Sequence, residues 1–335
     1  MAVVYLTTQG AQAHLHNGRL IVTYGQETLL RLPLTQISLL VLFGNIGLTT
    51  PLMGALLEKG AEIVFLTRYG RFRGRLHGHD TPHVALRRLQ YAALENPTWV
   101  LQMVRGLVTA KIQHQRGLLQ RYRRRKGTVP PEVDVAISRL QTALQTAGRK
   151  RSANALRGVE GTAARAYFGG LKALFRPACR FQGRNRRPPR DPVNALLSLG
   201  YTILLQKAQS AVQAVGLDPY AGFLHVADYG RPSMALDLME EFRPVVDGMV
   251  LKVCNQGLLS PEDFTYDGPN TRPISIKDEG LRRFLKDLES RFSQRFLHPI
   301  RKERLTLNQS LVEQAYQIAR RLRENRPGYR GMGFR

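Results

Sequence analysis

Short apolar runs separated by turn residues fill the first 76 positions of the chain. The runs are VVYL, AHLH, RLIVTY, TLLRLPL, ISLLVLF and EIVFL. Asn17-Gly18 lies between the second and third runs, and this dipeptide is typical of a two-residue hairpin turn. One short helix is expected at TTPLMGALLEKG, with Thr50 as its N-cap and Gly60 after its end. The pattern therefore predicts a mostly β domain with one helix.

From about residue 85 the apolar positions repeat with the period of a helix. We expect helices at roughly 97–126, 131–146, 150–175, 191–215, 232–255, 274–297 and 305–324. The fold class is therefore α+β, with a β-rich domain followed by a larger all-α domain. The expected boundaries are a β-rich domain at 1–76, a linker at 77–90, a helical domain at 91–324 and a tail at 325–335. The composition of the tail predicts disorder unless a partner orders it.

Positive charge is concentrated in the middle of the chain. The formal net charge is +25, and residues 100–190 alone hold 21 basic and 3 acidic residues. Such an excess repels itself in a folded protein unless a polyanion offsets it. Nucleic acid is therefore the expected class of partner.

Several other classes of protein lack support in the sequence. The chain has two cysteines, too few for a disulfide framework or a cysteine zinc site. It has neither GxxxxGK[ST] nor GxGxxG after a strand, the phosphate-binding motifs of nucleotide hydrolases and dinucleotide enzymes. Residues 32–57 carry no charge, but proline and glycine interrupt them repeatedly, so no membrane span is expected. No secretory signal is visible, and we expect a cytoplasmic protein.

Glu160 is the only carboxylate between Asp134 and Asp191, in an interval rich in arginine and lysine. A divalent cation is one reason for such an acid, because Mg²⁺ and Mn²⁺ need anionic oxygen ligands and would also coordinate a scissile phosphate. The alternative is an ion pair within the helix, with Arg157 or Arg165.

Residues 222–244 form the second informative segment. His225 precedes a helix expected to start near Pro232, and Asp237 and Glu240 are three residues apart on one face of that helix. An imidazole beside two carboxylates is a ligand set that Mg²⁺ or Mn²⁺ accepts. The alternative is a histidine satisfied in the core. If Glu160 converges on this segment, three ligands and an open position for substrate result.

Three segments taken together closely resemble the first CRISPR-associated protein family, the adaptation integrases and endonucleases. They are VEGTAARAYF around Glu160, NRRPPRDPVNALLSLGYTILL at 185–205, and GFLH with SMALDLMEEFRP at 222–244. The resemblance runs through almost the whole chain. It implies an N-terminal β domain and a C-terminal helical domain, as the apolar pattern also predicts.

The resemblance implies a site as well as a fold. Glu160, His225 and Glu240 fall on metal-ligand positions, for Mg²⁺ or Mn²⁺, and Asp237 falls on an adjacent acidic position that supports the site or binds DNA. Tyr167 falls on an aromatic position near the site, where it is either functional or a core residue. The reaction implied is a transesterification in which the 3′-hydroxyl of a short DNA fragment attacks a phosphodiester at the edge of a CRISPR repeat.

The partners implied are double-stranded DNA, as spacer fragment and repeat, a second copy of the chain bound through the β domain, and a small second CRISPR adaptation protein. Basic residues are expected to hold DNA phosphates rather than read bases. With Tyr167, the expected DNA contacts are Arg123, Arg124, Arg125, Arg184, Arg186 and Arg187. Two alternatives stay open: a stand-alone nuclease acting on branched DNA, and a non-catalytic nucleic-acid-binding module.

Overall fold

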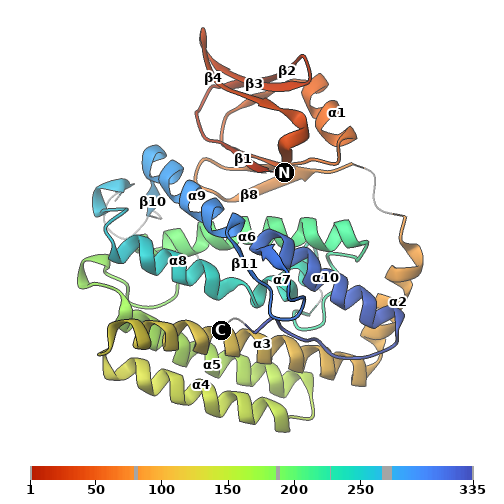
Figure 1. The fold of residues 1–335 in the computed structure, drawn as a ribbon, viewed down its shortest axis with the longest axis vertical. Helices are drawn as coiled ribbons and strands as arrows, with labels where there is room; N and C mark the ends of the chain where they lie inside the picture. Colours follow the sequence, from red (N-terminus) through yellow and green to blue (C-terminus); the bar gives the residue numbers. More distant parts are fainter. Residues whose placement is uncertain (1, 79–81, 186–188, 227, 266–273, 334–335) are drawn as a thin grey trace. The chain divides into compact units, whose positions relative to one another are not determined.

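Residues 2–78, 82–185, 189–226, 228–265 and 274–333 are described by the computed structural model, shown in Figure 1. They divide into two units. The first comprises residues 2–78, 263–265 and 275–289, and the second comprises the other described residues. The first is built mainly of strands and the second mainly of helices, which confirms the predicted α+β class.

Two four-stranded sheets make up most of the first unit. One has the order β1-β5-β7-β8 and the other the order β4-β3-β2-β6. The strands are β1 (Ala2–Leu6), β2 (Gln12–His16), β3 (Arg19–Tyr24), β4 (Glu27–Pro33), β5 (Ile37–Phe43), β6 (Gly47–Leu48), β7 (Glu62–Leu66) and β8 (Phe72–Leu76). Asn17 and Gly18 both have positive φ, 46° and 70°, as a type I′ hairpin between β2 and β3 requires.

The apolar faces of the two sheets and of α1 (Thr50–Glu58) share one core. Its buried members include Leu20, Leu40, Leu52 and Ile63. The N-cap of α1 is Thr49 and not Thr50, because Thr49 keeps extended backbone angles while Thr50 is already helical. The predicted helix is therefore present, and it is capped one residue earlier than expected.

A segment far along the chain completes the first unit. It holds the short strands β9 (Phe264–Thr265) and β10 (Ser275–Ile276) and residues 278–289 of α9 (Asp278–Ser293). Arg282 donates hydrogen bonds to the hydroxyls of Thr7 and Thr8 at 3.2 and 3.1 Å, and Tyr5 donates to Glu289 at 3.1 Å. These contacts hold the helix beside the end of β1, an association that the apolar pattern alone does not reveal.

Helices form nearly all of the second unit. They are α2 (Val84–Glu95), α3 (Pro97–Lys126), α4 (Pro131–Arg149), α5 (Ala153–Leu174), α6 (Pro192–Val215), α7 (Ser233–Glu240), α8 (Arg243–Asn255) and α10 (Leu307–Arg323), with two short paired strands, β11 (Arg295–Leu297) and β12 (Arg304–Thr306). Figure 1 shows α3, α4 and α5 together as one layer of this unit. Most residues of α6 are buried, so α6 is its central helix. No helix within the described residues combines the length and the apolar character that a membrane crossing requires.

Three features of the second unit differ from the sequence predictions. The expected linker at 77–90 contains the start of α2, at Val84. The single helix expected at 232–255 is two, α7 and α8, separated at Glu241 and Phe242. Pro244 explains this break, because proline has no N–H to donate to the carbonyl four residues earlier.

The third difference concerns the C-terminal tail. Tyr329 and Met332 are buried, and the hydroxyl of Tyr329 and the backbone amide of Met332 both donate to the carboxylate of Glu241. Gly106 of α3 lies so close to the main chain of Tyr329 that a Cβ there would overlap it. The prediction of a disordered tail is therefore wrong for residues 325–333, which pack along α3.

Candidate functional site

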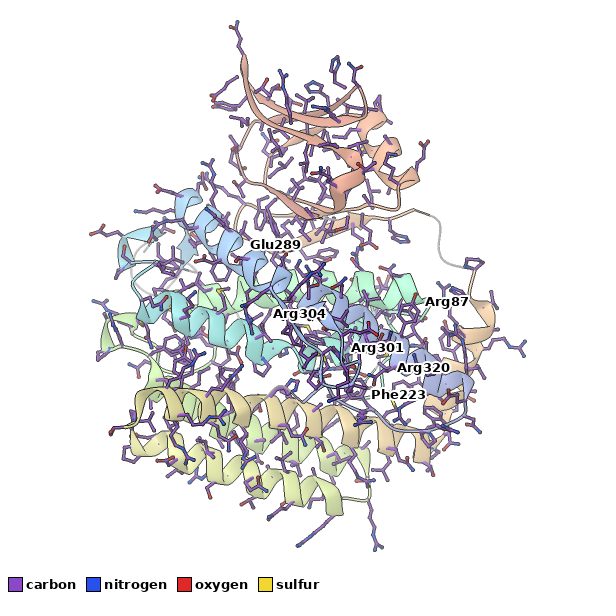
Figure 2. All side chains as sticks on the ribbon, viewed as in Figure 1. Arg87, Phe223, Glu289, Arg301, Arg304 and Arg320 are labelled. Atoms are coloured by element: carbon purple, nitrogen blue, oxygen red, sulfur yellow. The ribbon has the colours of Figure 1, made fainter. Side chains whose placement is uncertain are left out.

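Asp237 is a fully buried residue of α7 that organises the preceding loop. Its Oδ2 accepts hydrogen bonds from the backbone amides of Phe223 and Leu224 at 2.5 and 2.8 Å; Phe223 is labelled in Figure 2. Its Oδ1 accepts from the amide and from the ring Nδ1 of His225, at 2.9 and 2.7 Å. Both carboxylate oxygens therefore accept hydrogen bonds from the loop, and Asp237 fixes the position of His225.

Arg157 of α5 holds the same loop from its carbonyl side. Its guanidinium donates to the carbonyls of Leu224 and Phe223 at 2.7 and 3.1 Å. Since these hydrogen bonds to amides and to carbonyls come from two different helices, the backbone from Phe223 to His225 has little freedom. Arg157 also lies one turn before Glu160, so the loop and that acid are positioned by the same helix.

His225 is turned toward Glu240 by these contacts. Because the carboxylate of Asp237 only accepts, Nδ1 of the ring is the donor, and Nε2 is the atom that faces Glu240, 3.7 Å from its Oε1. The imidazole side chain keeps 20% of its exposure, which distinguishes it from a histidine satisfied in the core. Its Nε2 is the ring atom available to a ligand.

Glu240 is a buried carboxylate surrounded by cations. Arg243 Nε donates to its Oε1 at 2.7 Å, and the ammonium of Lys111 lies 2.5 Å from its Oε2. Burial alone would raise the pKa of Glu240, but Arg243, Lys111 and His225 together lower that pKa well below its ordinary value. The group is therefore a carboxylate at any pH near neutrality.

Glu160 meets the same ammonium from another helix. Its Oε1 forms an ion pair with Lys111 Nζ, whereas Arg157 serves the loop and Arg165 donates to Thr162. Side-chain exposure is 26% for Glu160, 10% for Lys111 and 4% for Glu240. Glu160 is therefore the most exposed of these three side chains.

Donor side chains from three helices and one loop converge at this point. Carboxylates from α5 and α7 approach one positively charged nitrogen on α3, and an imidazole nitrogen lies beside the second carboxylate. Within the described residues, no group of three or more histidine, cysteine or acidic side chains is already arranged to hold a metal ion. The donors nevertheless fit one, since two hard oxygen ligands and an imidazole suit Mg²⁺ or Mn²⁺, and a cation already stands between the carboxylates.

Tyr167 has a structural place that excludes the predicted DNA contact. Its ring is fully buried, and its hydroxyl donates to Asp247 Oδ2 at 2.6 Å. The hydroxyl of Tyr201 donates to the other oxygen of Asp247. Tyr167 is thus a core residue that ties α5 to α8.

The basic residues singled out from the sequence fall into three groups. Arg123, Arg124 and Arg125 are exposed at the end of α3, and Arg123 forms an ion pair with Asp134 at 3.0 Å. Arg184 donates to Asn194 and Ser198 at 2.8 and 3.2 Å and lies over the ring of Tyr201. Arg186 and Arg187 lie outside the described residues. The end of α3 is therefore the described part of this set that is open to a polyanion.

Two residues of the site escaped the sequence analysis, Lys111 and Arg243. Lys111 occupies a position between Val108 and Ile112 on the buried face of α3, and a lysine on such a face is rare unless it is paired. The position of this lysine on an apolar helix face could therefore have been noticed in the sequence. Arg243 stacks on Tyr201, with its guanidinium carbon 4.6 Å from the ring centroid, and this contact depends on tertiary packing.

Comparison with known sequences identifies the family to which the chain belongs. The family model described as CRISPR associated protein Cas1 matches residues 4–290. CRISPR-associated endonuclease Cas1 2 of Rhodospirillum rubrum is 39% identical, over 97% of this chain and 96% of its own length. CRISPR-associated endonuclease Cas1 3 of Thermus thermophilus is 37% identical, over 100% of this chain and 98% of its own.

Solved structures share the fold. A Cas1 protein from Thermotoga maritima has a TM-score of 0.81 at 22% identity, covering 99% of both chains. A chain of a Cas6-RT-Cas1–Cas2 complex also has a TM-score of 0.81, at 25% identity. That match covers 97% of this chain and 35% of the other, so this chain corresponds to about a third of the longer protein.

Proposed function

The chain belongs to the CRISPR-associated Cas1 family, and from this premise we propose that it joins the 3′-hydroxyl ends of a short DNA fragment to a CRISPR repeat. Glu160, Glu240 and His225 hold one Mg²⁺ or Mn²⁺ ion in this proposal. The observation that carries it is the approach of Glu160 and Glu240, from two helices, to a single cationic nitrogen. The endonuclease names of the relatives support the reaction class.

A divalent ion held by these residues would stabilise negative charge on the scissile phosphate and favour ionisation of the attacking hydroxyl. The residues of the chain do the rest. Asp237 fixes the ring of His225 with Nε2 free, and Arg243 keeps Glu240 in place and ionised. Glu160, the most exposed of the three ligands, borders the side by which DNA enters.

The chemistry is an exchange of phosphodiester bonds. A bond forms between the 3′-oxygen of the fragment and a phosphorus atom of the repeat, and the bond from that phosphorus to the 3′-oxygen of the preceding nucleotide, on its 5′ side, breaks. The proton of the attacking hydroxyl leaves to solvent, and the released 3′-oxygen takes one up. One phosphodiester replaces another, so no nucleotide triphosphate is required.

DNA is held by the basic middle of the chain in this proposal. Arg124 and Arg125 contact backbone phosphates, with Arg123 shared between DNA and Asp134. Arg186 and Arg187 join them in this proposal, while Arg184 donates to Asn194 of α6. The spacer fragment and the repeat are both double-stranded DNA, and recognition through phosphates requires no particular sequence.

Two protein partners complete the proposal. One is a second copy of this chain, bound through the β-rich unit, and the other is a small second CRISPR adaptation protein. The similarity to a chain of a Cas6-RT-Cas1–Cas2 complex supports the second partner. The predicted domain roles, dimerisation at 1–76 and catalysis at 91–324, belong to the same proposal.

The test is strand transfer of a short duplex with free 3′-hydroxyls into a supercoiled plasmid that carries a repeat. Reactions contain Mn²⁺, with and without the small partner. Glu160→Ala and His225→Ala should each lower the joined product by about 100-fold or more, because each removes a metal ligand, with DNA binding retained. Glu132→Ala is the matched control, an exposed acid of the same unit, and should behave as the wild type.

The outcomes separate the remaining functions. Joined product from the wild type and the control alone supports the integrase. Cleavage without joining would replace it by a stand-alone nuclease, in which water attacks. DNA binding without any reaction, in all variants, would leave only a nucleic-acid-binding module.

A further inference from the structure

Lys111 lies between two of the proposed metal ligands without being a ligand itself. Its ammonium pairs with both Glu160 and Glu240, which are the two carboxylates assigned to the metal ion. Without that ammonium, two anions from different helices would face each other in a partly buried site. The lysine therefore neutralises the site while no divalent ion is present.

The ammonium and a divalent ion cannot keep the same contacts. Glu240 already accepts from Arg243 through Oε1, so Lys111 occupies Oε2, the remaining oxygen. A divalent ion held by Glu160 and Glu240 would compete with the ammonium for the same two carboxylates, and two cations so close together would repel each other. One of the two cations must leave when the other binds.

Lys111 is the cation that is able to leave. Arg243 is largely enclosed, stacks on Tyr201 and donates to Glu240 from the next turn of the chain, so it is fixed. Lys111 has a flexible four-carbon stem, and its Nζ lies at the side of the site where Glu160 is 26% exposed. This stem would let the ammonium move away from the two carboxylates, whereas the contacts of Arg243 hold its guanidinium in place.

We propose that Lys111 is a resident counter-ion of the metal site, which holds Glu160 and Glu240 together before a divalent ion enters and then moves onto the phosphate of the bound DNA. This inference rests on the proposed function, since it assigns the same two carboxylates to the metal. It makes metal binding a competition between Mn²⁺ and an internal ammonium. Removal of the ammonium should therefore tighten metal binding while it slows the reaction.

The decisive experiment measures Mn²⁺ affinity directly, by titration followed with electron paramagnetic resonance, on full-length protein without DNA. Lys111→Met, which keeps the length but not the charge, should bind Mn²⁺ about tenfold more tightly than the wild type, as loss of one partly buried ion pair implies. Lys111→Arg should bind Mn²⁺ no more tightly than the wild type, because a guanidinium can form ion pairs with both carboxylates. The matched control is Lys207→Met, which removes another buried ammonium, one that donates to Asn308 and lies over Phe292.

Thermal unfolding gives an independent readout. Without metal, Lys111→Met should melt lower than the wild type because the two carboxylates repel each other. Saturating Mn²⁺ should then raise its melting temperature by more than it raises that of the wild type, since tighter binding gives a larger stabilisation. Strand transfer at saturating Mn²⁺ should fall about tenfold or more, with DNA affinity changed little.

The outcomes distinguish this inference from the function on which it rests. A wild-type protein that binds no Mn²⁺ would overturn the metal site itself. A wild-type protein that binds Mn²⁺, with Lys111→Met binding equally or more weakly, would overturn the counter-ion alone. Should Lys111→Met not fold, Lys111→Arg still decides, because an affinity above that of the wild type would contradict the competition.

Discussion

Asp237 holds His225 at two points with one oxygen atom. Oδ1 accepts from the backbone amide at 2.9 Å and from the ring Nδ1 at 2.7 Å, so the carboxylate fixes both the main chain and the orientation of the ring. The second carboxylate oxygen anchors the two residues before His225. A fully buried acid is thereby satisfied by four donors from one loop, and the imidazole presents Nε2 toward Glu240.

Replacement of Asp237 by asparagine should weaken metal binding. Each oxygen of Asp237 accepts from two donors, so the amide NH₂ of asparagine would face two donors in place of an acceptor. His225 would then lose its fixed orientation. We expect Mn²⁺ affinity to fall by about 10- to 100-fold, the usual cost of losing the residue that orients a ligand. Equilibrium Mn²⁺ titration checks this. Asp134→Asn, at an exposed ion pair, serves as control; equal affinities for the two variants would show that Asp237 does not orient the ligand.

Asp247 should make stability depend on pH. Burial raises its pKa from 3.8 to about 6, although hydrogen bonds from Tyr167 and Tyr201 and the charge of Arg243 act to lower it. The folded protein therefore holds a proton that the unfolded chain has released between about pH 4 and pH 6, and this group destabilises the fold increasingly as pH rises through that window. Above it, the cost is constant at about 3 kcal/mol, and below it the cost vanishes.

Urea unfolding of the wild type and Asp247→Asn across pH 4 to 7 isolates this contribution. The variant keeps a polar group for the two tyrosines but has nothing to titrate. Its free energy of unfolding should gain about 3 kcal/mol on the wild type between pH 4 and pH 7. Other carboxylates, such as Glu240, change in both proteins alike and cancel. A pH-independent difference between the two proteins would mean that Asp247 does not titrate in this range.

Most helices and strands could be predicted because their buried residues repeat with the spacing of a helix or of a strand. Along α4 the buried positions are Val133, Ala136, Ile137, Leu140 and others at the same spacing, which is the face of a single helix. The division between α7 and α8 could have been predicted too, since Pro244 marks it. The packing of the tail could not, because its glycine- and arginine-rich composition is that of a disordered segment and its partner, Glu241, is far away in sequence.

Some residues of the candidate site could likewise be predicted from the sequence, and others could not. Glu160 stood out as a lone acid among basic residues, and His225, Asp237 and Glu240 stood out as an imidazole beside two carboxylates, which the resemblance then assigned to the site. The contact of Lys111 with Glu160 and Glu240 depends on how α3 packs against α5 and α7, which no local pattern encodes. The sequence also left Tyr167 open between core and function, and only its burial and its bond to Asp247 decide for the core.

The tail should contribute measurably to stability through Tyr329. Its hydroxyl donates to the buried carboxylate of Glu241 and accepts from Gln314 Nε2 at 2.7 Å. Tyr329→Phe removes both bonds, and a hydrogen bond to a charged group is worth about 1.5–3 kcal/mol. We expect a loss of that size in the free energy of unfolding by urea. Tyr316→Phe, on the exposed side of α10, should change it little; similar losses in both would exclude a specific role for the tail.

The salt dependence of DNA binding tests the end of α3 separately from catalysis. Arg124 and Arg125 are exposed, whereas Arg123 is paired with Asp134, so the first two are the stronger candidates for phosphate contacts. Log affinity falls with log salt, and each lost phosphate contact makes this slope shallower by about 0.9 for duplex DNA. The slope of the double alanine variant should therefore be shallower than that of the wild type by about 1.8. Fluorescence anisotropy at several salt concentrations measures this slope. The double variant of Arg19 and Arg31, exposed residues of the β-rich unit, removes the same charge and should leave the slope unchanged. If both double variants shift it equally, general charge and not the end of α3 governs DNA binding.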